Sequence, residues 1–486
     1  MVQVTVVNMI PQSLSGETNN DSEPNLTVNP VNPLQMAASA FTPNPAGAGD
    51  APIFVSIDGG NTWFLQTIVP SDQMTADITL RFSGTNHLYA GIIRTPIQQD
   101  ANGNLHPRLN ILRSDNIQSG QKMKVLVDRT GAGVDQPYIQ ATSKNSGAGA
   151  AKDVVIVGDN DFNQPGGRTA TMDVSVDAAA ARPAFNKIDI DSRKPAIPSA
   201  DAPSIRPAIH SDGTIYGAFL HTVGGSNLSN ILRSVIVVRD DNWTMGANPF
   251  TALKDPSDGF AGRILVSNRL IPFLPPQGQP GPIGQERIGS HITIAVDPRP
   301  NESGSVYVAW ADRVGTDDYT LHVRSSSDRG VTWSPNDLLT ITNALNPALA
   351  INSDGLIGFL YQQYTGPLSP GIVTASNQWV THLRLSADGI NWNDLVLAQV
   401  PANAPSAMIS PGVFGLPYLG DYLHLLTINK DFYGIFSANN TPNQSHFPNG
   451  VAYQRNHDFN TGRLLDMDGT SLVDISIDPF FFKVTP

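Results

Sequence analysis

Short stretches in which apolar and polar residues alternate recur along the whole chain, and each is followed by a run rich in aromatic and β-branched residues. A period of two is the pattern of a β-strand with one buried face. The alternating stretches are 25–28, 78–80, 138–140, 207–209, 292–296, 348–351 and 423–426. The runs that follow them are 34–41, 88–94, 154–158, 214–220, 306–310, 356–361 and 432–436. Seven such strand pairs predict an all-β chain built from repeats.

Three turns between predicted strands have nearly the same sequence. Residues 56–63 and 326–333 share the pattern Ser-x-Asp-x-Gly-x-Thr-Trp, and 386–392 is a version one residue shorter. Asp and Gly favour a tight turn, the Ser and Thr hydroxyls can bond local backbone groups, and Trp can pack back on the sheet. We therefore interpret these residues as structural and not catalytic: Asp58, Trp63, Asp328, Trp333, Asp388 and Trp392.

This turn pattern resembles the Asp-box (BNR) repeat of sialidase-like β-propellers. The resemblance implies a single β-propeller of four-stranded blades. The turn aspartates predict seven blades: Asp58, Asp115, Asp177, Asp241, Asp328, Asp388 and Asp458. Six blades, as in sialidases, remain the alternative, because 160–205 interrupts the pattern.

We expect strands from both ends of the chain to close the ring, with 2–7 joining the sheet formed by 415–467. The whole of 1–486 is then one propeller domain. Within it, 1–20 is a closing strand and linker, 21–467 forms the blades, and 468–486 is a C-terminal strand with a hydrophobic tail. The tail contains Phe480, Phe481 and Phe482, which either pack under the last blade or serve as a docking anchor for a partner.

Composition narrows the class of protein. A formal net charge of −12 argues against a nucleic-acid partner, which needs a basic face. Cysteine is absent, which rules out disulfides and thiolate chemistry. No apolar stretch approaches the ~20 residues that span a bilayer, so we predict no membrane insertion. Without a signal-peptide pattern at residue 1, we expect a soluble protein that is cytoplasmic or exported without a classical signal.

The candidate site follows from the propeller geometry. The first residues of the inner strands and the loops after the second strands are expected to surround the axis. The polar side chains there that suit sugar binding are Glu23, His291, Asp312, Arg313, Gln362 and Asp421. A Pro/Gly-rich insertion at 271–285 would reach the same region as a lid, or else decorate the surface.

Similarity to sialidases also implies candidate catalytic residues. Residues 204–207 (Ser-Ile-Arg-Pro) match the motif that carries the first substrate-binding arginine, although one Ile is missing. The resemblance then implies Arg206 and Arg287 as carboxylate ligands, Tyr422 as nucleophile with Glu286 or Glu23 as its partner, and Asp77 or Asp135 as acid. No third arginine can be assigned. We therefore favour a non-catalytic binding or structural module, with a glycan or a protein as partner, and keep a sialidase-like exo-glycosidase as the alternative.

One segment resembles the start of a calcium loop. Asp159, Asp161 and Asn163 place oxygen ligands at alternate positions, but the Gly and bidentate Glu of an EF-hand are missing. A polar loop at a strand end is the other interpretation. No further cofactor is predicted, since the sequence has no nucleotide-binding glycine motif.

Overall fold

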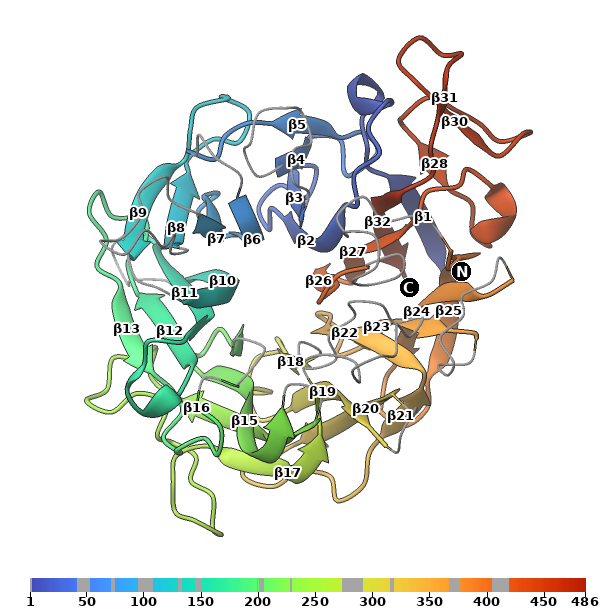
Figure 1. Cartoon of the computed structure of the whole chain (residues 1–486). Coiled ribbons are helices and arrows are strands. Elements are labelled where there is room, and N and C mark those ends of the chain that lie inside the picture. The colour runs from blue at the N-terminus through green and yellow to red at the C-terminus, as the bar shows by residue number, and fades with distance from the viewer. Residues whose placement is uncertain are drawn as a thin grey trace.

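The computed structural model describes residues 2–41, 53–70, 75–94, 108–129, 133–144, 150–198, 200, 205–227, 230–272, 292–314, 319–366, 376–403 and 419–486. These residues form β-strands and contain no α-helix, and their only helical turns are the short 3-10 turns at 12–14, 165–167 and 444–446. The strands form sheets arranged in a ring around a central axis (Figure 1).

The sheets follow one another along the chain, and in six of them the four strands are hydrogen-bonded in sequence order. The first three sheets contain β2 (Ser22–Val28), β3 (Met36–Phe41), β4 (Ile53–Ser56) and β5 (Phe64–Gln66); β6 (Thr75–Phe82), β7 (Leu88–Arg94), β8 (Arg108–Ser114) and β9 (Lys124–Arg129); and β10 (Val134–Lys144), β11 (Lys152–Asp161), β12 (Ala170–Ser175) and β13 (Asn186–Asp189). The next three contain β14 (Arg206–Ile209), β15 (Ile215–Asn227), β16 (Asn230–Asp240) and β17 (Arg263–Leu270); β18 (Ile292–Val296), β19 (Val306–Arg313), β20 (Tyr319–Ser326) and β21 (Leu339–Thr342); and β22 (Ala344–Ile351), β23 (Ile357–Tyr364), β24 (Gln378–Ser386) and β25 (Asn393–Pro401).

The first strand of each sheet lies innermost and contacts the first strand of the next sheet. Contacts run from β2 to β6, β10, β14, β18 and β22 in turn, and then to β26 (His424–Ile428), which contacts β2. The ring is therefore closed, and the predicted all-β propeller is confirmed. Apolar side chains fill the space between neighbouring sheets, as Val55, Leu80 and Leu88 do between the first and second.

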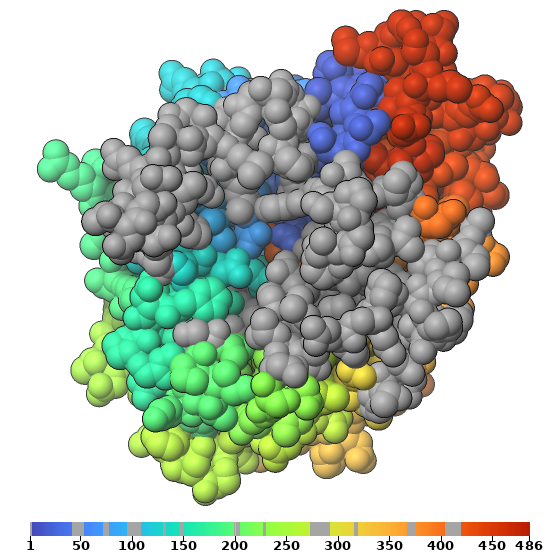
Figure 2. All heavy atoms as spheres, in the orientation of Figure 1, coloured from blue at the N-terminus to red at the C-terminus, as the bar shows by residue number. Residues whose placement is uncertain are grey.

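Both ends of the chain belong to the closing sheet. Its strand order is β26, β27 (Asp431–Asn439), β32 (Ile477–Thr485), β1 (Gln3–Asn8) and β28 (Ala452–Tyr453). The N-terminal and C-terminal segments, blue and red, lie side by side at the rim (Figure 2). Three short strands, β29 (His457–Asp458), β30 (Arg463–Leu465) and β31 (Leu472–Val473), form a separate small sheet.

The C-terminal phenylalanines lie inside this closing sheet. Phe480, Phe481 and Phe482 are each 0% exposed, and Phe482 pairs in register with Gly434 on one side and Val6 on the other. The hypothesis of a docking anchor is wrong for the folded chain, because burial of the three rings completes the core and leaves none for a partner.

The three similar turns adopt the same hydrogen-bond pattern. In the first, Thr62 donates to Asp58 from its backbone N (3.0 Å) and from its hydroxyl (2.6 Å). The indole N–H of Trp63 donates to the Gly60 carbonyl at 3.0 Å. The turns at Asp328 and Asp388 repeat this arrangement.

Each of these turns joins the third and fourth strands of its sheet, on the outer side of the ring (Figure 1). Their aspartates therefore serve as turn residues at the perimeter. Other predicted turn aspartates bind basic side chains: Asp115 binds Arg113, Asp177 binds Lys152 and Asp241 binds Arg329.

Candidate functional site

Polar side chains gather where the inner strands begin, at one end of the axial channel. Seven of them come from the first, second, third, fourth and closing sheets. We call these seven residues the mouth cluster: Glu23, Asp77, Gln136, Tyr138, Arg206, Asp421 and Tyr422. Six are less than 10% exposed, and Tyr138 is half-buried. Charges in such positions are costly unless partners or a ligand compensate them.

A repeated backbone feature places several of these residues. Glu23, Gln136 and Asn346 each precede a proline, have φ between 49° and 55°, and lie where the register of the inner strand shifts. Positive φ is rare for residues other than glycine and costs conformational energy. Arg206 also precedes a proline at the start of its strand.

Arg206 lies between two aromatic rings. Its guanidinium carbon is 4.5 Å from the ring centroid of Tyr138 and 5.7 Å from that of Tyr422. Its Nη2 donates a long hydrogen bond of 3.4 Å to the side-chain oxygen of Gln136. Cation–π contacts of this kind are strongest when the cation is desolvated, as it is here.

Gln136 links two carboxylates of the cluster. Its backbone N donates to Asp77 Oδ2 at 3.1 Å, and its side-chain Nε2 donates to Asp421 Oδ2 at 2.9 Å. Gln136 of the third sheet is therefore hydrogen-bonded to Asp77 of the second sheet, Arg206 of the fourth and Asp421 of the closing region.

The cluster surrounds a tyrosine that stays protonated. Burial, together with the carboxylates of Asp77 and Glu23, raises the pKa of Tyr422 well above its ordinary value, and Arg206 offsets only part of this. Within the described structure, the buried Tyr422 hydroxyl has no hydrogen-bond partner. Buried polar atoms without a partner are uncommon in native proteins and call for an explanation.

The structure thus brings together five of the residues singled out from sequence: Glu23, Asp77, Arg206, Asp421 and Tyr422. The sequence pattern pointed to Asp135 and not to Gln136 or Tyr138. Asp135 is half-buried and accepts the backbone N–H of Gln136 at 3.0 Å. A polar residue followed directly by proline recurs at 23, 136, 206 and 346. This pattern could have identified Gln136 from the sequence.

Other predicted residues lie in different surroundings. Asp312 is buried and accepts hydrogen bonds from His322 Nε2 (2.8 Å) on its own sheet and from Arg269 Nε (2.7 Å) on the neighbouring fourth sheet. Arg313, half-buried, ends the same strand. Gln362 donates to the Ser437 carbonyl at 2.9 Å and so joins the sixth sheet to the closing sheet. Glu286, Arg287 and His291, and all but two residues of the insertion at 271–285, lie outside the described residues.

The candidate calcium ligands are bound to basic side chains. Asp159 pairs with Arg129, and Asp161 pairs with Lys187 at 2.9 Å. Burial raises the pKa of Asp159 to about 7 although Arg129 opposes this. Asn163 contributes its backbone N–H to Asp161 at 3.0 Å. Calcium binding here stays a prediction, and it would have to displace Arg129 and Lys187.

Among the described residues, one group of three carboxylates has metal-like spacing: Glu17, Asp21 and Asp478. Arg455 already lies against it, with Nη1 at 3.2 Å from Glu17 and 2.9 Å from Asp478. The group therefore acts as an ion-pair network in the closing region.

No helix in the described part of the chain is long and apolar enough to cross a membrane.

No protein-family model and no curated protein matches this chain. Among solved structures, it is similar to the α-L-arabinofuranosidase Arb93A of Fusarium graminearum bound to an iminosugar inhibitor (10% identity, TM-score 0.46, 80% of this chain and 99% of that chain). It is also similar to a polysaccharide lyase, the PL25 ulvan lyase (11% identity, TM-score 0.49, 87% and 92%). A third is Trypanosoma rangeli sialidase (12% identity, TM-score 0.38, 99% and 58%). Similarity this distant assigns neither a ligand nor a role to any residue.

Proposed function

We propose that this chain binds carbohydrate at the mouth cluster and does not cleave it. The observation that carries this proposal is the buried Tyr422 hydroxyl, which has no hydrogen-bond partner in the described part of the chain although carboxylates, an amide and a guanidinium surround it. A sugar hydroxyl would supply the missing hydrogen bond. The half-buried ring of Tyr138 offers apolar surface to a sugar ring, and the polar groups around it can fix the orientation of the sugar.

The charges of the cluster favour a neutral sugar. Among the described residues, Glu23, Asp77 and Asp421 contribute three carboxylates, and Arg206 contributes one guanidinium. A sugar carboxylate would meet a negative site and compete with Asp77 and Asp421 for that guanidinium. Hydroxyl groups, in contrast, can donate to carboxylates and accept from Arg206 and Gln136.

Tyr422→Phe tests this proposal on a glycan array and by calorimetry with the best neutral sugar. The substitution removes a hydroxyl that has no hydrogen-bond partner among the described residues, so we expect the melting temperature to stay the same or rise. We expect the sugar affinity to fall by about tenfold, because the sugar loses a buried hydrogen bond. A variant that binds as tightly as the wild type, or a wild type that binds no glycan, would refute the proposal.

Arg206→Met is the second variant, and Arg384→Met is its matched control. Arg384 also lies over a tyrosine, 5.7 Å from the ring centroid of Tyr361, but on the third strand of another sheet. We expect Arg206→Met alone to lose sugar binding, while both variants lose similar packing. Equal loss in both would mean that the array reports stability and not a site.

A sialidase-like exo-glycosidase is the second candidate function, and the position of Tyr422 favours it. A tyrosine nucleophile needs a neighbouring base, and Asp77 and Glu23 lie close enough to influence its pKa. A panel of fluorogenic glycosides, including a sialoside, separates the two candidates. Turnover that disappears in Tyr422→Phe would establish the enzyme, and binding without turnover would establish the recognition module.

A further inference from the structure

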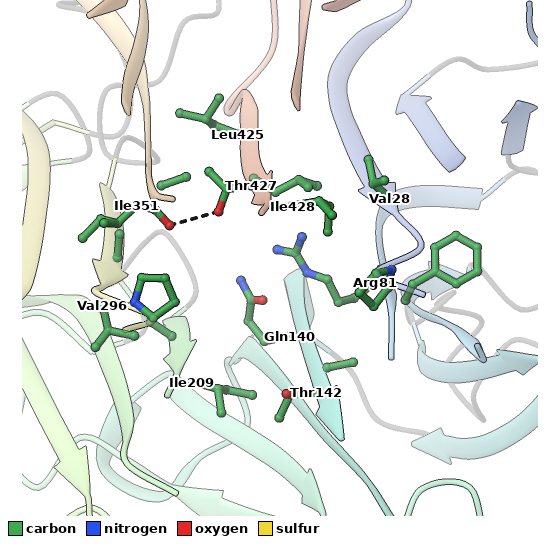
Figure 3. A pocket seen from close by; sticks show the side chains of 18 of the residues that line it. Val28, Arg81, Gln140, Thr142, Ile209, Val296, Ile351, Leu425, Thr427 and Ile428 are labelled. Atoms are coloured by element: carbon green, nitrogen blue, oxygen red, sulfur yellow. Dashed lines mark hydrogen bonds between the residues drawn. The ribbon is translucent and has the colours of Figure 1, made fainter. Parts of the chain in front are cut away.

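A second site lies further along the axis. The later residues of the inner strands line an open cavity of about 410 Å³. Its exposed lining is mixed, slightly more polar than apolar, and includes the apolar side chains of Ile209, Val296, Ile351, Leu425 and Ile428 (Figure 3). Its volume lies in the range of small-molecule sites.

Arg81, on β6, points its guanidinium into this cavity (Figure 3). Of the described residues that line the cavity, it alone is charged. Its Nη2 lies 3.0 Å from Nε2 of His424, and its Nε has no hydrogen-bond partner within the described structure.

Among the residues that the structure describes, no acidic group balances the charge of Arg81. It forms no ion pair with any described residue, and Tyr138 is the one ionisable neighbour that affects its pKa. His424 carries no compensating charge: it is either neutral or cationic, and burial and the neighbouring Arg81 hold its pKa well below the ordinary value, so it is neutral. Arg206, by comparison, has Asp77 and Asp421 nearby.

An unbalanced cation that points into a cavity favours an anionic ligand. Removing a cation from water costs free energy that an opposite charge offsets. Guanidinium groups bind carboxylates through parallel hydrogen bonds, and the guanidinium end of Arg81 points into the cavity (Figure 3). The apolar side chains of the wall would cover a short hydrocarbon chain.

We propose that this cavity binds a small monocarboxylate, with its carboxylate on Arg81 and its short apolar chain against Ile209, Val296 and Ile351. No residue of the mouth cluster lines this cavity, although Tyr138 of that cluster neighbours Arg81. With this cavity, the channel has two ligand sites of different chemistry.

Calorimetric titration of the full chain with sodium butyrate tests the proposal. Butyramide serves as the neutral analogue, and sodium phosphate as an anion without an apolar chain. We expect saturable binding of butyrate, binding that is about tenfold weaker or absent for the other two, and none to Arg81→Met. Absence of butyrate binding to the wild type, or equal binding of butyramide or phosphate, would overturn the proposal.

Arg299→Met is the matched control. Arg299 follows Pro298 of the cavity wall but already pairs with Asp297 at 2.6 Å. We expect this variant to bind butyrate like the wild type. A similar loss in Arg299→Met and Arg81→Met would show that general positive charge, and not a site, attracts the anion.

Gln140→Glu keeps the test decisive if Arg81→Met fails to fold. Gln140 faces the same cavity as Arg81 (Figure 3). A glutamate there would give Arg81 a partner of its own, so we expect the melting temperature to be unchanged or higher while butyrate binding is lost. Binding equal to that of the wild type in this variant would contradict the proposal.

Discussion

The carboxylate of Asp153 shows how single residues join neighbouring sheets. It lies on β11 with no exposed surface, yet accepts hydrogen bonds from the second sheet at Thr85 (2.6 Å), His87 (3.0 Å) and Tyr89 (2.8 Å). Ser143 of β10 donates to its other oxygen at 2.6 Å. Burial alone would raise the pKa of Asp153, but the hydrogen bonds from His87, Ser143, Thr85 and Tyr89 outweigh it and lower the pKa to about 2.

We expect Asp153→Asn to lower the free energy of unfolding by about 2–4 kcal/mol, because an amide cannot accept from all these donors. Since the pKa of this carboxylate is depressed from 3.8, its contribution is present above pH 3.8 and is lost as the pH falls toward 2. Urea unfolding between pH 7 and pH 2 checks both effects. A variant with the same acid sensitivity as the wild type in this range would contradict the account.

At the scale of elements, the three similar turns stabilise the outer edge of their sheets. Asp328 accepts the Thr332 backbone N–H at 2.8 Å and the Thr332 hydroxyl at 2.6 Å, far from the inner strands that form the mouth cluster. Hydrogen bonds from the Asn391 and Ile390 backbone likewise hold the pKa of Asp388 well below its ordinary value.

We therefore expect Asp328→Ala to lower the free energy of unfolding by about 1 kcal/mol and to leave sugar binding unchanged. Chemical denaturation and calorimetry measure the two quantities. Asp354→Ala, at an exposed surface ion pair, is the control and should change neither. Loss of sugar binding in Asp328→Ala without unfolding would assign these turns a role in the site.

The inner strands could be predicted from the sequence, but the side chains that face the axis could not. Alternation of apolar and polar residues is a local pattern, and it predicted the strands. The residues that face the axis depend on register shifts, such as the one between Asp135 and Tyr138. A shift of one residue turns a different side chain toward the axis, which is why Gln136 was missed. Asp312 and Gln362 bind residues of neighbouring sheets instead of a ligand, because Arg269 and Ser437, which are distant in sequence, face them.

At the scale of the molecule, ring closure depends on the two ends of the chain. Arg455 is 1% exposed and donates to the carbonyls of Ser15 (2.8 Å) and Glu17 (2.7 Å) in the N-terminal segment. It also pairs with Asp478 of β32 at 2.9 Å. The repeat pattern predicted that both ends would close the ring, but no local pattern marks this ion pair.

We expect Arg455→Met to lower the free energy of unfolding by about 3–5 kcal/mol, since it leaves Asp478 buried without its cation. Lys430→Met is the control, because Lys430 pairs with Asp354 at an exposed surface and should cost less than about 1 kcal/mol. Urea unfolding compares them. Equal effects would mean that the buried pair does not hold the ring closed.

The central claim is that the mouth cluster is a carbohydrate site, and a crystal structure of the chain soaked with its best-binding neutral sugar tests it most directly. The account predicts a sugar hydroxyl within hydrogen-bond distance of the Tyr422 hydroxyl, with further contacts to Gln136 or Asp421. A sugar bound elsewhere, or an empty mouth cluster at a saturating sugar concentration, would contradict it.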